Sequence, residues 1–223
     1  MERNSYPIYA RLRAHAPIAE VPAAICWFAN CWRDLEAINR SKDFTAASDD
    51  APVNLAYGRP NVLTSQGPVN AKLRAGIEPH YRPRAVAGYI EALVRPLAEA
   101  QLESFLSSGD SDPMSGYFEP ISALALARSF GLSLVDMPTL RRCFHGLCHG
   151  AINFERDPAR QAICEGVVAE IEGVLLPLLE DLKAAPNASP PSHLLHGGMS
   201  PGQPRLPEAV LPTIKITLLG GMQ

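Results

Sequence analysis

The side chains best suited to bind a ligand lie in the segment 66–86. It begins Gln-Gly-Pro-Val-Asn-Ala-Lys-Leu-Arg and continues to Pro-His-Tyr-Arg-Pro-Arg. Gly67 and Pro68 follow polar residues and suit the first turn of a helix, where a missing proline N–H costs nothing. Asn70 and Arg74 then fall four residues apart on one face of that helix. A guanidinium there could bind a carboxylate in two places; the alternative is an ordinary solvated arginine.

A second group with ligand chemistry comprises Cys143, His145, Cys148 and His149. The two histidines share a helix face at a spacing that can hold zinc. The two cysteines would project in other directions, and no second cluster supplies the remaining ligands. Packing in the core is therefore favoured over a metal site. The chain has five cysteines, an odd number without a disulfide framework, and we expect them to be reduced and mostly buried.

Composition excludes several classes of function. With 20 basic and 23 acidic residues, no charge surplus indicates a nucleic acid or an anionic membrane as partner. No apolar run is long enough to span a bilayer, and no signal-peptide core follows the N-terminus. Phosphate-binding loops and a nucleophile elbow are absent, which leaves nucleotide, nicotinamide and flavin binding unsupported. We expect a soluble cytoplasmic protein.

Hydrophobic periodicity predicts a mainly helical chain with strand character near Trp27. After the segment 66–86, helices are expected at residues 84–106, 117–130, 136–152, 157–182 and 206–223. Pro96 should kink or break the helix 84–106. Two stretches rich in Gly and Pro, 46–63 and 184–205, are predicted to be irregular, the first a long loop and the second a linker.

The segment 66–86 resembles the C helix of the cytochrome P-450 haem-thiolate monooxygenases, Asp-Gly-Pro-x-His-x-x-Leu-Arg followed by Pro-x-Phe-x-Pro-Arg. The Gly, Pro, Leu, Arg and both later prolines match in register. The resemblance implies haem as cofactor, with Arg74 bound to a haem propionate. Asn70 stands at the family's His position, where it can donate a hydrogen bond but brings no positive charge.

Other segments resemble the rest of the family's N-terminal half, from its A helix and first strands to the start of its I helix. Gly220 and Gly221 match the small pair beside the family's oxygen site, and Gln223 stands where an acid is expected. By the same resemblance, residues 136–152 and 157–182 are the F and G helices that roof the substrate chamber. Substrate-side residues are then expected at Leu63, Phe144 and Leu147.

The family's axial cysteine, which follows a Phe in a Gly-rich loop, and its Glu-x-x-Arg pair have no counterpart in this chain. We therefore expect residues 1–223 to be a partial P-450 domain, mainly α with a small N-terminal β-sheet and truncated within the I helix. Half a fold would leave apolar residues of that last helix exposed, such as Ile214 and Leu218.

The resemblance implies the N-terminal portion of a haem- and iron-binding monooxygenase that inserts one oxygen atom from O2 into an apolar small molecule, inactive by itself. Electrons would come from a separate ferredoxin- or flavodoxin-type donor, docked in part on Lys72, Arg82 and Arg84. Two alternatives stay open: a non-catalytic helical remnant or interaction module derived from that fold, and an unrelated helical scaffold.

Overall fold

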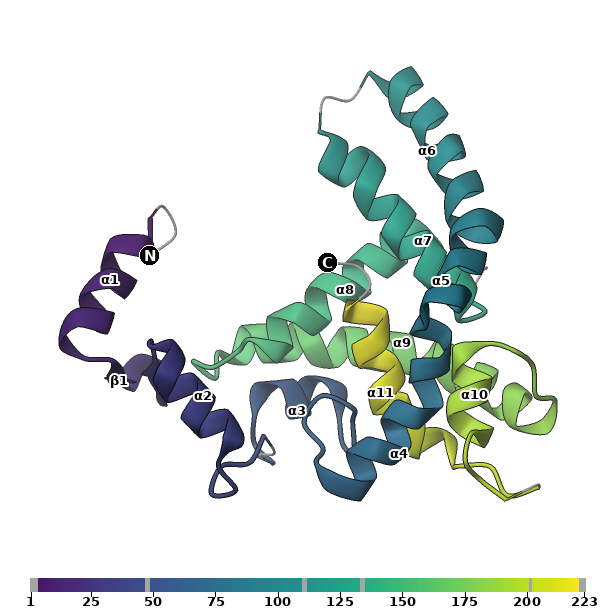
Figure 1. Ribbon diagram of the computed structural model, residues 1–223. Helices are drawn as coiled ribbons and strands as arrows, with labels where there is room; N and C mark the ends of the chain where they lie inside the picture. Colours follow the sequence, from purple (N-terminus) through teal and green to yellow (C-terminus); the bar gives the residue numbers. More distant parts are fainter. Residues whose placement is uncertain (1–3, 47–48, 110–111, 133–134, 201, 221–223) are drawn as a thin grey trace.

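The computed structural model describes residues 4–46, 49–109, 112–132, 135–200 and 202–220. Within these ranges the protein is mainly helical, with one small antiparallel sheet, as the sequence predicts (Figure 1). Among the described helices, none is long and apolar enough to cross a membrane.

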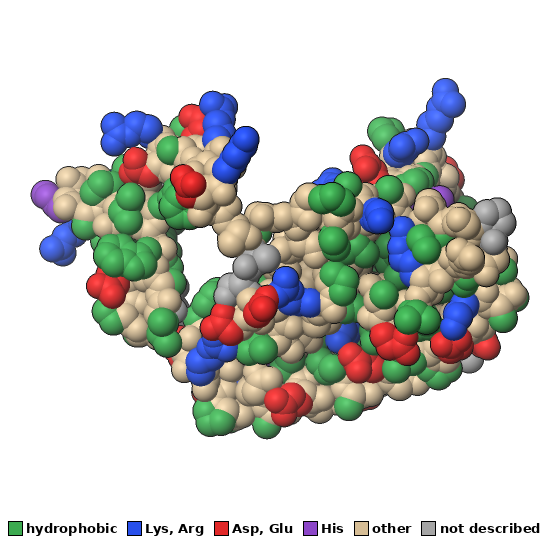
Figure 2. All heavy atoms as spheres, turned by 90° about the horizontal axis from the view of Figure 1, so that it is seen from below, with side chains coloured by type: hydrophobic (Ala, Val, Ile, Leu, Met, Phe, Trp, Pro, Cys, Tyr) green, Lys and Arg blue, Asp and Glu red, His purple; other side chains and the backbone are tan. Residues whose placement is uncertain are grey.

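The N-terminal part forms a small module beside the helical body (Figure 1). It consists of α1 (Tyr6–His15), β1 (Ile18–Val21), β2 (Cys26–Ala29) and α2 (Trp32–Arg40). The strands pair antiparallel, with Ile18 opposite Ala29 and Val21 opposite Cys26. This module stands at the left of the space-filling view (Figure 2). Several of its large apolar side chains are exposed: Tyr6, Ile25, Trp27 and Trp32. A two-stranded sheet of this kind has little stability of its own.

The core lies where α8 (Met137–Ala151) and α9 (Pro158–Ala184) pack together. The short helix α3 (Pro52–Tyr57) and the last helix α11 (Pro207–Gly220) close it from other sides. Asp136 and Asp157 cap the two long helices through backbone N–H groups of their first turns, which is why both begin where predicted. Further helices complete the body: α4 (Gly67–Ile77), α5 (Pro83–Tyr89), α6 (Arg95–Ser108), α7 (Glu119–Ser129) and α10 (Pro190–His196).

The helix expected at 84–106 is interrupted, as its proline predicts. A π-helical turn, Ile90–Val94, separates α5 from α6. The N–H of Arg95 donates to Ile90 O, one residue farther back than in an α-helix, and the widened turn makes room for the ring of Pro96. A second π-helical turn, Met114–Phe118, precedes α7.

The linker interpretation of residues 184–205 is wrong, because α10 in its middle belongs to the core. Leu194 and Leu195 are fully buried, and α10 contacts α4, α9 and α11. Ser189 accepts a hydrogen bond from Ser192 N and is followed by prolines in the first turn, a common way to begin a helix. The stretch 46–63 is likewise not wholly irregular, since α3 lies within it.

The expectation of an exposed last helix is also wrong for this structure. Ile214 and Leu218 are buried, and Ile216 is half-buried. Contacts with α3, α8, α9 and α10 cover these side chains. The helix α11 therefore has a core within this chain to pack against.

Candidate functional site

A cavity of about 300 Å³ beside α4 combines an arginine with apolar walls. It lies between the loop that follows α3, the helix α4 with the turn after it, and the helix α11. Its apolar lining consists of Val62, Leu63, Ile77, Tyr81 and Ile216. Arg74 and Glu78 supply the charged part. The cavity therefore offers mostly apolar walls with one cation and one carboxylate beside them.

The packing of α4 explains the position of Arg74. Leu73 and Gly76 are buried, and the missing side chain of Gly76 lets α4 approach Leu194 of α10 closely. Arg74 lies between them in sequence and is turned outward, where it is exposed. Within the described part of the chain, its guanidinium makes no hydrogen bond or ion pair. Its positive charge is available to an anion in the cavity.

The structure places Leu63 beside Arg74 but uses Asn70 differently. Leu63 lines the same cavity, with 60% of the residue exposed at its mouth. Asn70 is absent from this lining, and its Nδ2 donates to Val62 O at 2.7 Å. That bond holds the loop after α3 against α4. A role for Asn70 at a propionate stays a prediction, for which one amide hydrogen remains.

Phe144 and Leu147 lie elsewhere, against a void of about 20 Å³ among α7, α8, α9 and α11. A void of that size holds at most one water molecule. Leu147 is buried there, and Leu218 of α11 lines the same void. The structure therefore does not bring Phe144 and Leu147 together with Leu63 and Arg74, and their contact with a substrate stays a prediction.

Gly220 is exposed at the end of α11. A Cβ built on it would meet no described atom within 4 Å. Gly221 and Gln223 lie outside the described residues. The oxygen-site role of the glycine pair therefore stays a prediction.

The cysteines of α8 and α9 are thiols rather than ready metal ligands. Burial raises the pKa of the Cys143 thiol to about 11, and it also raises the pKa of Cys148 and of Cys164. The thiolate is the form that binds metal. His145 and His149 are exposed on α8. Among the residues for which the structure gives positions, no group of three His, Cys, Asp or Glu could hold a metal ion.

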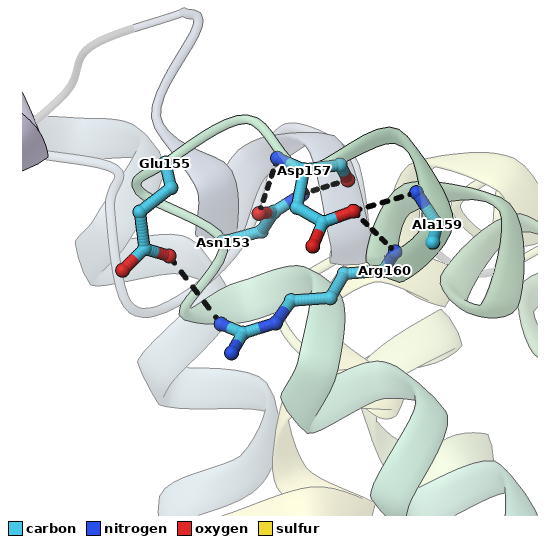
Figure 3. Close-up of polar contacts among 5 residues, drawn as sticks. All are labelled: Asn153, Glu155, Asp157, Ala159 and Arg160. Atoms are coloured by element: carbon cyan, nitrogen blue, oxygen red, sulfur yellow. Dashed lines mark hydrogen bonds and ion pairs between the residues drawn. The ribbon is translucent and has the colours of Figure 1, made fainter.

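The turn between α8 and α9 is held by its own side chains (Figure 3). Asn153 Nδ2 donates to Asp157 O, and Asp157 N donates back to Asn153 Oδ1, each at 2.9 Å. Asp157 Oδ1 accepts from the backbone N–H groups of Ala159 and Arg160 and so caps α9. Arg160 also pairs with Glu155 at 3.4 Å. These bonds fix how the chain passes from α8 to α9.

Sequence reasoning missed several residues of the site and its surroundings. Glu78 and Tyr81, from the turn after α4, line the cavity together with Ile216 of α11, which is distant in sequence. Lys215 of α11 is buried and donates to Glu172 of α9 at 2.6 Å. A lysine among the apolar residues of that helix was the available signal, but its partner lies 43 residues away in sequence.

Comparisons with known proteins agree with this architecture. No family model matches the chain. Cytochrome P450 109 of Bacillus spizizenii is 20% identical over 192 residues, which cover 85% of this chain and 45% of that protein. The chain thus spans about half the length of the curated relative that it matches.

Solved structures match almost the whole chain. P450BioI, in complex with an acyl carrier protein ligated to hexadec-9Z-enoic acid, superposes with a TM-score of 0.81 at 18% identity, over 99% of this chain and 58% of that one. The myxobacterial CYP267B1 with myristic acid gives a TM-score of 0.81 at 18% identity, over 99% of this chain and 57% of that one. CYP109E1 from Bacillus megaterium with testosterone gives a TM-score of 0.80 at 17% identity, over 98% of this chain and 56% of that one. The chain therefore has the fold of the N-terminal half of the bacterial cytochromes P-450.

Proposed function

We propose that this chain forms the N-terminal part of a haem-dependent monooxygenase, which inserts one oxygen atom from O2 into an apolar small molecule. The observation that carries the proposal is the guanidinium of Arg74, without a described partner, in the wall of a largely apolar cavity. An apolar ring with carboxylates on its edge matches that combination of groups. The P-450 fold of the chain adds support.

The residues present fit one edge of a haem. Arg74 would bind a propionate, while Leu63, Ile77 and Ile216 would border the ring and exclude water from it. Because Arg74 is exposed, this pairing would contribute on the order of 1 kcal/mol. Bound haem would supply oxygen activation. No cysteine lines this cavity, so the described residues account for binding and not for iron ligation.

An apolar substrate is supported by the ligands of the structural relatives, which include myristic acid and testosterone. We propose that α8 and α9 cover this substrate, with Phe144 on the substrate side.

The separate ferredoxin- or flavodoxin-type donor would dock on exposed basic residues of α4 and the segment after it, Lys72, Arg82 and Arg84. Reversing the charges of Arg82 and Arg84 in a reducible, complete enzyme should slow its reduction. Unchanged reduction would remove this docking face.

Haem titration of the purified chain tests the main proposal. We expect a saturable Soret shift for the chain as given and about tenfold weaker binding for Arg74→Glu, because an anion then faces the propionate. Arg128→Glu is the matched control, since Arg128 is exposed on α7 and does not line the cavity. No saturable shift in the parent chain, or equal losses in both variants, would contradict the proposal.

A non-catalytic helical module is the second candidate. It is favoured by the core around α11, where contacts within the described residues bury Ile214 and Leu218. Such a module should be monodisperse and unfold cooperatively, yet show no saturable haem binding. A saturable Soret shift that Arg74→Glu weakens would exclude it.

A further inference from the structure

A buried amide joins α3 to the loop that follows it. Asn61 is fully buried, with 0% of the residue exposed. Its Nδ2 donates to Asn54 Oδ1 at 3.0 Å and to Gly58 O at 2.8 Å. Its Oδ1 accepts from the backbone N–H of Leu63 at 3.0 Å and from that of Thr64 at 2.8 Å. Both hydrogens and both acceptor positions of this amide are therefore used.

The hydroxyl of Thr64 closes the network. Thr64 Oγ1 lies 2.6 Å from Asn54 Oδ1 and 3.0 Å from Asn61 Oδ1, and all three residues are buried. A hydroxyl donates only one hydrogen, so it serves one of these acceptors at a time. The network connects positions ten residues apart and gives the loop 58–64 a defined shape through polar groups that are themselves buried.

This loop is attached to the rest of the protein on two sides. Gly58 has a φ of +87°, and a Cβ there would lie 3.3 Å from Pro212 Cγ of α11. On the other side, Val62 O accepts from Asn70 of α4. Between these attachments, Val62 and Leu63 form one wall of the cavity that contains Arg74 and Ile216. The amide of Asn61 thus accepts directly from the backbone N–H of Leu63, whose side chain lines the cavity.

We infer that Asn61 is a positioning residue, which holds the Val62–Leu63 wall at the distance from Arg74 that the ligand requires. For the identity of the ligand, haem, this inference rests on the proposed function. For the position of the wall, it rests only on the contacts of Asn61. A connection that merely joined α3 to α4 could lie on the surface, with its backbone bonded to water.

The first test compares Asn61→Ala with Asn153→Ala by amide hydrogen exchange and haem titration. Asn153 is a matched control, because it is also a buried asparagine that organises a turn through its side chain, but it lies outside the cavity. In Asn61→Ala we expect at least tenfold faster exchange at the N–H groups of Leu63 and Thr64, and at least tenfold weaker haem binding. In Asn153→Ala only the turn before α9 should exchange faster, with haem affinity unchanged.

A milder pair keeps the inference testable if Asn61→Ala does not fold. Thr64→Val removes the hydroxyl from the network at nearly constant volume, and Thr64→Ser restores it. Faster exchange at Leu63 and weaker haem binding in the Val variant, both recovered in the Ser variant, would support the positioning role. A parental exchange rate at Leu63 in Thr64→Val would overturn it.

The two readouts separate this inference from the proposed function. If the parent chain binds no haem, the proposed function fails, while exchange at Leu63 and Thr64 still decides whether Asn61 holds the wall. If the parent binds haem and Asn61→Ala and Asn153→Ala weaken it equally, the proposed function stands and the positioning role is wrong.

Discussion

Lys215 of α11 and Glu172 of α9 form an ion pair in which Lys215 Nζ lies 2.6 Å from Glu172 Oε1. The lysine side chain is 4% exposed and the glutamate side chain 32%. The pair therefore lies at the edge of the core, with its cation inside. Lys215 also lines the small void against Phe144 and Leu147, so this contact links the last helix to the part of the core that the sequence assigned to substrate.

The two partners of this pair should respond differently to replacement. Glu172→Gln leaves a buried ammonium without its counter-charge and should lower the free energy of unfolding by about 2 kcal/mol, less than a fully buried pair because Glu172 is partly solvated. Lys215→Met replaces the cation with an apolar chain of similar length and should cost less than about 1 kcal/mol. Urea unfolding measures both. A larger loss for Lys215→Met would show that the pair contributes net stability.

Gly76 should tolerate no side chain. A Cβ there would lie 2.6 Å from Leu194 Cδ1 and 3.1 Å from Leu194 Cα, so Gly76→Ala must push α4 away from α10. We expect a loss of about 1–3 kcal/mol in the free energy of unfolding. Gly88→Ala is the control, since nothing described lies within 4 Å and α5 should gain about 0.5–1 kcal/mol. Equal effects in thermal unfolding would contradict the close approach of α4 and α10.

His80 should make stability depend on pH. Burial lowers the pKa of its imidazole below 6.5, and the nearby charge of His193 lowers it further. Its ring also meets that of His193 edge-on at 5.3 Å, and Nδ1 lies 3.3 Å from the Tyr89 hydroxyl. The unfolded chain therefore binds the proton more readily than the folded chain. The contribution of neutral His80 to the free energy of unfolding is complete above pH 6.5 and decreases as the pH falls below that value.

Urea unfolding at pH 7.5 and at pH values below 6.5 measures this effect. The parent chain should lose stability on acidification, and His80→Gln should lose less. His149→Gln serves as control, because His149 is exposed on α8, and it should keep the parental pH dependence. The prediction is wrong if His80→Gln and the parent show the same slope.

Cys143 should resist alkylation in the native protein. Its pKa of about 11, raised mainly by burial, leaves about one thiol in a thousand ionised at pH 8. Iodoacetamide should therefore modify Cys143 at least about 100-fold more slowly in buffer than in concentrated urea, where the thiol regains its ordinary pKa. Peptide mass spectrometry at timed quenches follows the reaction. Similar rates in both solvents would mean that α8 opens readily from α9.

The sequence alone was sufficient to place the starts of α4, α8 and α9, because the signals that begin a helix are local. Asp136, Asp157 and the Gly67-Pro68 pair satisfy or remove N–H groups within one turn of themselves. Motif register also indicated the P-450 fold, which the structural matches confirm. The same kind of local signal marked Arg74 as a candidate for binding a carboxylate, because its spacing from the helix start is a property of one short segment.

Tertiary structure alone decided which of these residues meet. It put Leu63 beside Arg74, placed Leu147 against a separate void, and turned the Pro-rich stretch around Leu194 into core. Such contacts join positions far apart in sequence, and whether a short polar or Pro-rich segment is buried depends on the faces that neighbouring helices leave uncovered. Asn61 reads as a loop residue in isolation, and only the folded structure, in which its amide bonds to Asn54, Gly58, Leu63 and Thr64, removes that amide from water.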